Sequence, residues 1–381
     1  MAISLFAIGW RDDSLVTPVS HLVESPKINI GPKRYSRKGS AMKRYLAPVF
    51  CCVLFLAGWI AIDANAQATT ARTHVERARL AAYEPGQDFT HEYDELCVEP
   101  RPSPPAAQPT AAPATPRIPP RSEWYEEPAK VFDNLYYVGS NNNSVWAVTT
   151  SAGIILIDAD QDYAVEAEVV AGMKKMGLDP AQIKYVILTA GKPQIYGGTK
   201  HLQDNYNARA LLSEADWSVI ARSNVPSGIK PKKDMVVTDG QKLTLGDVTV
   251  TLYVTPGHTP GTVSMLISPL KDGTQRHVGS VFGGRAPGYQ GDGVQYFPSE
   301  VEGIRTWSAS TKRYKEIVEK AGVEVFLSTH GSHDKTLDKL HALKFRKPGG
   351  PHAFVSKPAV GRFLTVIYEC MDAQLAWRKS E

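Results

Sequence analysis

The chain has no excess of charge of one sign outside its N-terminal part. Residues 1–68 contain eight Lys and Arg against four Asp and Glu, which accounts for the whole formal net charge of +4, so residues 69–381 balance to zero. Proteins that bind nucleic acid usually carry a basic patch or stripe that neutralises phosphates. The main part of the chain therefore offers no electrostatic support for nucleic-acid binding.

Two kinds of motif are also absent. No Gly-x-Ser-x-Gly sequence occurs, so the nucleophile elbow of a serine hydrolase is missing. No internal repeat is short enough to indicate a solenoid. With 43% hydrophobic residues, the chain is instead expected to bury a sizeable core.

Cysteine is scarce. Of four cysteines, Cys51 and Cys52 lie in an apolar run, which leaves Cys97 and Cys370 for the rest of the molecule. In an oxidising compartment this pair can form a disulfide between an N-terminal arm and the last helix. The alternative is two unrelated buried thiols.

An export signal is predicted at residues 42–68. A short basic segment precedes the apolar run Tyr45–Ile62, and small residues around Ala64–Ala68 provide a cleavage site. The run is also nearly long enough for an uncleaved membrane anchor, and a buried helix is a further alternative. The polar, basic extension 1–41 precedes this signal, so translation starts at Met1 or at Met42. We expect an exported protein, periplasmic or secreted.

The remainder divides into an arm, a spacer and a domain. Residues 69–98 form the N-terminal arm, which contains a helical candidate at Thr70–Ala82. Residues 99–120 contain nine prolines and are predicted to be an extended or disordered linker. The main domain is expected at residues 121–381.

The pattern of this domain predicts an α/β (α+β) fold. Successive strand-like segments at Val131–Gly139, Ser144–Thr150 and Gly153–Ala159 precede the amphipathic helix Tyr163–Met176. Meandering strands followed by strands mixed with helices occur a second time, and long helices close the chain. This layout predicts two sheets packed face to face between helices, a four-layer αββα sandwich.

The stretch Ile187–Gly198, reading ILTAGKPQIYGG, is the most informative in the domain. A strand-like run leads into Thr189, and a Gly-Gly pair leads into a predicted helix at Thr199–Asn205. Three other stretches accompany it in a fixed order. They are GIILIDA at Gly153–Ala159, TPGHTPGTVS at Thr255–Ser264 and FLSTH at Phe326–His330.

Together these stretches resemble the metallo-β-lactamase superfamily, and within it exported proteins close to the third subclass. The resemblance covers about residues 124–380. It implies the αββα fold of zinc-dependent hydrolases, a structural aspartate at Asp158 and zinc-binding histidines at His258 and His330.

The zinc ligands of the loop are missing. In the active family this slot reads Thr-His-x-His-x-Asp-His-x-Gly-Gly, and its side chains help to hold two zinc ions. Thr189 and both glycines fit this frame. The ligand positions carry Ala190, Lys192, Gln194 and Ile195. By resemblance each metal would keep one ligand of three, His258 or His330, whereas a catalytic zinc ordinarily needs three protein ligands.

Lys192 opposes metal binding further. At 4 Å and an effective dielectric constant of 20, an ammonium repels a dication by roughly 8 kcal/mol. Lys192 is therefore interpreted as a charge that replaces the metal and attracts an anion, as a partner of Asp158, or as a solvated lysine at the mouth of a cleft. Ile195 indicates that part of the cleft has become apolar.

His258 and His330 are interpreted as remnant ligands of low occupancy or as packing residues on loops whose shape persists. Asp334 follows closely and is predicted to cap a helix at Lys335–Lys344. The cleft is expected to be lined by Ala190, Lys192, Gln194, Ile195 and Asp158, and the catalytic residues stay unassigned.

Three functions follow from this sequence. The first is a pseudoenzyme that binds a small molecule in the old cleft, with no cofactor and zinc implied by resemblance only. The second is a hydrolase of an ester, lactam or lactone with an altered or metal-free mechanism. The third is a weak mononuclear metal site. No contact with a membrane is expected beyond an uncleaved signal anchor.

Overall fold

A computed structural model describes residues 66–83, 89–100, 118–284 and 286–378. The extension 1–41, the predicted signal up to residue 65 and most of the proline-rich linker lie outside these residues. Within the described part, no helix combines the length and the hydropathy that crossing a membrane requires.

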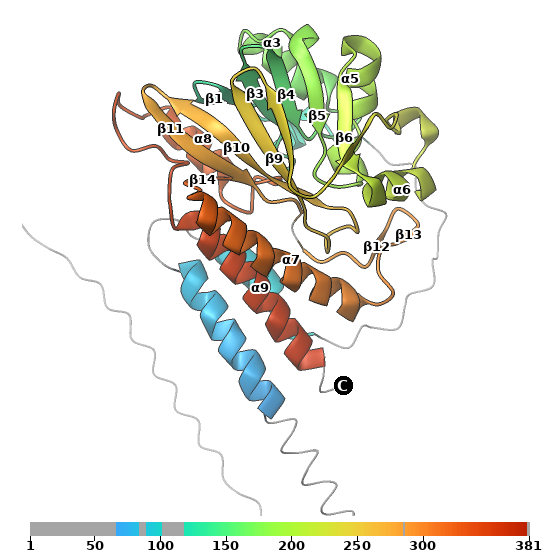
Figure 1. Cartoon of the computed structure of the whole chain (residues 1–381), viewed down its shortest axis with the longest axis vertical. Helices are drawn as coiled ribbons and strands as arrows, with labels where there is room; N and C mark the ends of the chain where they lie inside the picture. The colour runs from blue at the N-terminus through green and yellow to red at the C-terminus, as the bar shows by residue number, and fades with distance from the viewer. Residues whose placement is uncertain (1–65, 84–88, 101–117, 285, 379–381) are drawn as a thin grey trace, which may run out of the picture. The chain divides into compact units, whose positions relative to one another are not determined.

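Two β-sheets form the centre of the domain (Figure 1). The first has the order β1-β2-β3-β4-β5-β6-β7, antiparallel up to β4 and parallel from β4 to β7. Its strands are Ala129–Phe132, Leu135–Tyr137, Trp146–Thr150, Gly153–Ile157, Ile183–Ile187, Arg209–Ser213 and Met235–Val237.

The second sheet has the order β14-β11-β10-β9-β8, antiparallel except for the parallel pair β11–β14. Its strands are Gln241–Leu245 (β8), Val248–Val254 (β9), Val263–Asp272 (β10), Gln275–Val281 (β11) and Val325–Leu327 (β14).

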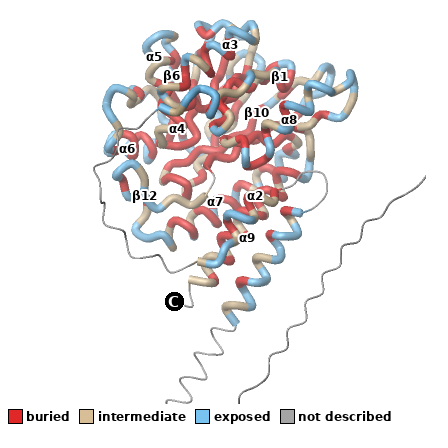
Figure 2. Tube along the Cα trace, turned by 180° about the vertical axis from the view of Figure 1, so that it is seen from behind, coloured by how far each residue is buried: buried red, intermediate tan, exposed pale blue. Residues whose placement is uncertain are grey.

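Side-chain alternation along the strands creates the layers. In β3, Trp146 and Val148 face the second sheet and join the core between the sheets, whereas Ala147 faces the opposite side. β4 repeats this pattern, with Ile155 turned inward and Leu156 outward. Both faces of these strands are therefore buried, as Figure 2 shows by the colour of the inner layers.

Helices cover the outer face of each sheet (Figure 1). On the first sheet these are the π-helical turn η2 (Glu166–Val170) continuing into α3 (Ala171–Lys175), then α4 (Pro193–Tyr196), α5 (Thr199–Tyr206) and α6 (Glu214–Arg222). On the second sheet they are α7 (Glu300–Ala321) and α9 (Ala359–Arg378). A further helix, α8 (Thr336–Leu343), packs against β1. The four-layer αββα prediction is confirmed.

The N-terminal arm packs on α9. Residues 66–83 are helical, and α2 (Thr90–Leu96) follows. Phe89 packs edge-on against Phe363 with ring centroids 5.4 Å apart, and Gln374 donates hydrogen bonds to the carbonyls of Leu96 and Val98. The arm is thus part of the same hydrophobic cluster as α7 and α9.

Cys97 and Cys370 form a disulfide across 273 residues of sequence. This settles the choice between a disulfide and two separate thiols. The bond joins the end of α2 to the middle of α9, so it fixes the arm covalently on the domain.

Some elements differ from the sequence-based expectations. The predicted strand Val131–Gly139 is a hairpin, because the turn at Asp133 and Asn134 separates β1 from β2. A short hairpin of β12 (Gln290–Gly291) and β13 (Val294–Gln295) precedes α7.

The disulfide should contribute strongly to stability. Replacing Cys97 and Cys370 together by serine is expected to lower the free energy of unfolding by about 2–5 kcal/mol, because the unfolded chain regains the freedom of a long closed loop. Urea denaturation of the oxidised protein and of the double variant measures this difference. An unchanged midpoint would show that noncovalent contacts alone hold the arm.

Candidate functional site

The predicted site residues come together at one edge of the sandwich. Asp158 follows β4, the altered loop follows β5, His258 follows β9, and His330 follows β14. The carboxyl ends of β4 and β5 meet at one edge because these strands are parallel, and β9 and β14 point the same way within the second sheet. Ligand sites commonly form outside such carboxyl ends.

Asp158 fixes the start of the altered loop. Its carboxylate accepts hydrogen bonds from the Thr189 backbone N–H at 2.8 Å and from the Thr189 hydroxyl at 2.9 Å, and only 2% of the residue is exposed. Burial raises the pKa of Asp158 to about 7, against the opposing effect of these two bonds. The structural role that the resemblance implies for Asp158 agrees with this geometry, and Lys192 is not recorded among its partners in the described structure.

Part of the altered loop is buried in the hydrophobic core. Ala190 and Ile195 are both buried and belong to the core beneath the first sheet. The carbonyl of Ile195 accepts a bond from the Ala159 N–H at 2.9 Å, which ties the loop to the strand that carries Asp158. Gln194 lies half-buried in the first turn of α4. Two of the four expected ligand positions are thus core residues rather than donors.

Lys192 occupies the position before α4 in an extended conformation. Its side chain is half-buried, and its Nζ lies 5.8 Å from the centre of the Tyr296 ring. Burial lowers the pKa of Lys192, while the carboxylates of Asp292 and Asp216 act in the opposite direction. In the described part of the chain, no hydrogen bond or ion pair is recorded for this ammonium.

Asp216, in the first turn of α6, was not singled out from the sequence. Its carboxylate accepts bonds from the Gly191 N–H at 2.7 Å, the Gly261 N–H at 2.8 Å and the Thr259 hydroxyl at 2.5 Å. It therefore joins the altered loop to the loop that carries His258. The sequence signal is only an acidic residue in a helical first turn, a position that is usually solvated.

His258 lies in the second of these loops and is 8% exposed. Its Nδ1–H donates to the carbonyl of Ala286 at 2.7 Å, so Nε2 is left toward the other site residues. Burial, then the neighbouring positive charge of Lys192 and then His330, lowers the pKa of His258 to about 3. The imidazole is neutral at physiological pH. The charge of Lys192 and the ring of His330 are thus near enough to act on His258.

His330 is held by the segment formed by Asn142 and Asn143, which precedes β3. Its Nδ1–H donates to the carbonyl of Asn142 at 3.1 Å, and a β-bridge links it to Asn143. Asp160 fixes that segment by accepting bonds from the Ser140 N–H and the Asn143 side chain, both at 3.0 Å. Both remnant histidines thus use Nδ1 for the backbone.

The expectation for Asp334 was wrong. The residue before α8 is Lys335, and no side chain caps the helix. Asp334 is buried instead and accepts bonds from the Thr336 hydroxyl at 2.5 Å and from Lys339 at 2.8 Å. Asp334, which precedes α8, forms a buried ion pair with Lys339 one turn into the helix instead of capping it.

The donors at this site do not fit a dinuclear zinc centre. Two imidazoles remain, and the other positions supply two apolar groups, an ammonium and an amide. Among the described residues, the one group of three His, Cys, Asp or Glu side chains close enough to share an ion lies elsewhere, at His74, Glu369 and Asp372. There, Asp372 already accepts bonds from Ser308 and Lys312.

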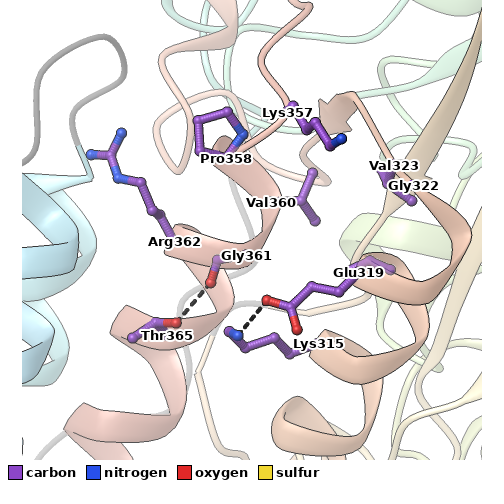
Figure 3. A pocket seen from close by; sticks show the side chains of 11 residues that line it. Lys315, Glu319, Gly322, Val323, Lys357, Pro358, Val360, Gly361, Arg362 and Thr365 are labelled. Carbon is purple, nitrogen blue, oxygen red and sulfur yellow. Dashed lines mark hydrogen bonds and ion pairs between the residues drawn. The ribbon is translucent and has the colours of Figure 1, made fainter.

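A cavity of about 420 Å³ lies away from this site, between the end of α7 and the start of α9 (Figure 3). Lys315 and Glu319 pair along its wall, and Arg362 points away from it to donate to the carbonyl of Ala81. None of the four loops described above contributes to its lining.

No protein-family profile matches the chain. Solved structures that resemble it are metallo-β-lactamases. The HARLDQ-motif metallo-β-lactamase of Cronobacter sakazakii is 26% identical with a TM-score of 0.56, over 68% of this chain and 99% of its own. BJP-1, a subclass B3 metallo-β-lactamase of Bradyrhizobium japonicum, is 24% identical with a TM-score of 0.56, over 67% and 95%. The chain therefore has the metallo-β-lactamase fold, and its likeness to these structures supports a place in the metallo-β-lactamase superfamily.

The carboxyl group of Asp216 should make stability depend on pH. Burial raises its pKa to about 6 from the ordinary 3.8, so the folded chain binds more protons than the unfolded chain between these values. The free energy of unfolding is then expected to fall as pH rises from 4 to 6, by about 3 kcal/mol at most from this group. Asp216→Asn should reduce that slope.

Urea denaturation at several pH values measures the slope. Glu214→Gln is the matched control, because Glu214 lies in the same first turn but is 62% exposed and pairs with Lys233 at the surface. This control should keep the wild-type slope. An Asp216→Asn variant with an unchanged slope would show that Asp216 is ionised throughout the range.

Proposed function

We propose that this chain is an exported binding protein that retains the fold of a zinc-hydrolase superfamily and takes a small molecule in its cleft without a dinuclear zinc centre. The observation that carries the proposal is the altered loop. Its frame is intact, because Asp158 and Asp216 hold its first residues and the Ala159 N–H holds the carbonyl of Ile195, while Ala190 and Ile195 are buried among apolar side chains.

The remaining donors support a metal-free cleft. A zinc ion bound by His258 or His330 would have one imidazole where three protein ligands are usual. Lys192 would add a repelling charge to the same place, since its charge already affects His258. Without a metal, nothing at the site supplies the lowered water pKa on which zinc hydrolases depend.

A comparison of loop sequences supports the same conclusion. The Cronobacter sakazakii protein is described by the motif HARLDQ. The loop of this chain reads AGKPQI at Ala190–Ile195, so both have a cation at the third letter. The histidine and the aspartate of that motif are replaced here by Ala190 and Gln194, which leaves fewer donors.

The ligand is expected to carry a negative charge. Lys192 presents an ammonium beside the face of Tyr296, and burial makes an uncompensated charge costly. In a ligand with a carboxylate and a small apolar body, the carboxylate would pair with Lys192 and the apolar body would pack on the Tyr296 ring. Lys192 then has the role of a unit positive charge in place of the metal.

A second function has one observation in its favour. His258 commits Nδ1 to the backbone carbonyl of Ala286 and is neutral, so its Nε2 is an acceptor. A neutral imidazole is the usual general base of metal-free hydrolysis. Hydrolysis of an ester, lactam or lactone is therefore the alternative.

Zinc content tests the main proposal. Purified protein dialysed against micromolar zinc is expected to retain far less than one zinc per chain by elemental mass spectrometry. His258→Ala and His330→Ala should leave this value unchanged. His74→Ala is the control for the surface cluster with Glu369 and Asp372, since zinc lost in that variant alone belongs there.

One or more zinc ions per chain, lost on replacing His258 or His330, would contradict the proposal. Ligands other than the expected ones would then complete the site.

Turnover distinguishes the two functions. If the protein only binds its ligand, it should hydrolyse a panel of esters, β-lactams and lactones no faster than the His258→Ala/His330→Ala double variant does. Hydrolysis that survives chelation and disappears in the His258→Ala variant would favour the metal-free enzyme. Product formation followed by liquid chromatography measures both outcomes.

A further inference from the structure

Unlike the half-buried lysines Lys200 and Lys230, Lys192 has neither an ion pair nor a hydrogen bond in the described part of the chain. Lys200, on the neighbouring helix α5, pairs with Asp204 at 2.6 Å, and Lys233 pairs with Glu214 at 2.6 Å. Lys192 has the Tyr296 ring at 5.8 Å as its recorded neighbour in the described structure. A half-buried amine without an ion pair is available to react with a ligand.

The backbone that carries this amine is rigid. The carbonyl of Lys192 accepts bonds from the Ile195 N–H at 2.9 Å and the Tyr196 N–H at 3.0 Å, which begin α4. The preceding residue, Gly191, is held by Asp216 at 2.7 Å. The root of the side chain is therefore fixed, as a covalent attachment point requires.

The groups that face the amine come from three elements. Asp216 lies on α6, Asp292 lies in the β12–β13 turn, and His258 lies in the loop after β9. The oxygens of Asp216 are occupied by three donors. Asp292 is exposed, and its carboxylate can accept a proton.

We propose that Lys192 is a covalent binding site for small 2-oxo acids and related carbonyl compounds that carry a carboxylate, which it holds as a reversible iminium. This inference rests on the proposed function, because it requires a cleft without zinc. Burial lowers the pKa of Lys192, which increases the fraction of the neutral amine that can act as nucleophile.

The reaction balances without an outside reagent. The amine nitrogen attacks the carbonyl carbon, a C–N bond forms, and the carbonyl oxygen leaves as water. Starting from the ammonium, two of its three hydrogens leave in that water and one remains on the iminium nitrogen. The single positive charge is conserved beside the carboxylate of the ligand, so the bound state keeps the ion pair that attracts the anion.

Reductive trapping tests this site. The full protein is incubated with glyoxylate and sodium cyanoborohydride near neutral pH, and peptide mass mapping locates the carboxymethyl group. Most of the label is expected on Lys192. Lys192→Arg should lose that label while it keeps the charge and the fold, and Lys200→Arg is the matched control that should keep it.

A label spread evenly over exposed lysines, or one unchanged in Lys192→Arg, would overturn the inference. Thermal unfolding of each variant confirms that the protein is folded. Zinc is measured in the same samples. A zinc-free protein without label on Lys192 overturns the iminium site and leaves the binding function intact, whereas a zinc-loaded site overturns both.

Discussion

The carboxylate of Asp216 is the interaction on which the rest of the site depends. It joins two loops that lie 70 residues apart in sequence, through Gly191 on one side and Thr259 and Gly261 on the other. Gly261 is required there, because an added Cβ would lie 1.9 Å from the Ser213 hydroxyl. Hydrogen bonds to a buried charged group contribute more than ordinary ones, and losing them leaves buried donors unpaired.

This arrangement explains how the loops keep their shape without metal ligands. Asp158 holds the start of the altered loop, Asp160 holds the segment behind His330, and Asp216 joins the remaining two loops. Each carboxylate satisfies backbone N–H groups that no strand or helix pairs. The ligand positions can then change to Ala190 and Ile195 while the surrounding backbone stays in place.

Much of the fold was predictable because β3 and β4 are nearly continuous apolar runs, which are typical of strands buried on both faces. Trp146 and Ala147 accordingly lie in the cores on opposite faces of the first sheet. The four motif stretches also predicted which loops share one edge. Asp216 was not predictable, because its partners are two backbone N–H groups and the Thr259 hydroxyl, all distant in sequence. The sequence also could not decide whether Cys97 and Cys370 form a disulfide, because only the packing of the arm on α9 brings the two cysteines together.

Lys192 supplies a positive charge to the site. A dication would hold neutral imidazoles by coordination, whereas here the positive charge of Lys192 acts together with burial to keep His258 neutral. His258 then offers a lone pair on Nε2 rather than a second positive charge. Lys192 beside the Tyr296 ring can pair with one carboxylate of a ligand, and Nε2 of His258 can accept a hydrogen bond from an adjoining polar group. Under the proposed function, the altered loop is an anion site with a single positive charge.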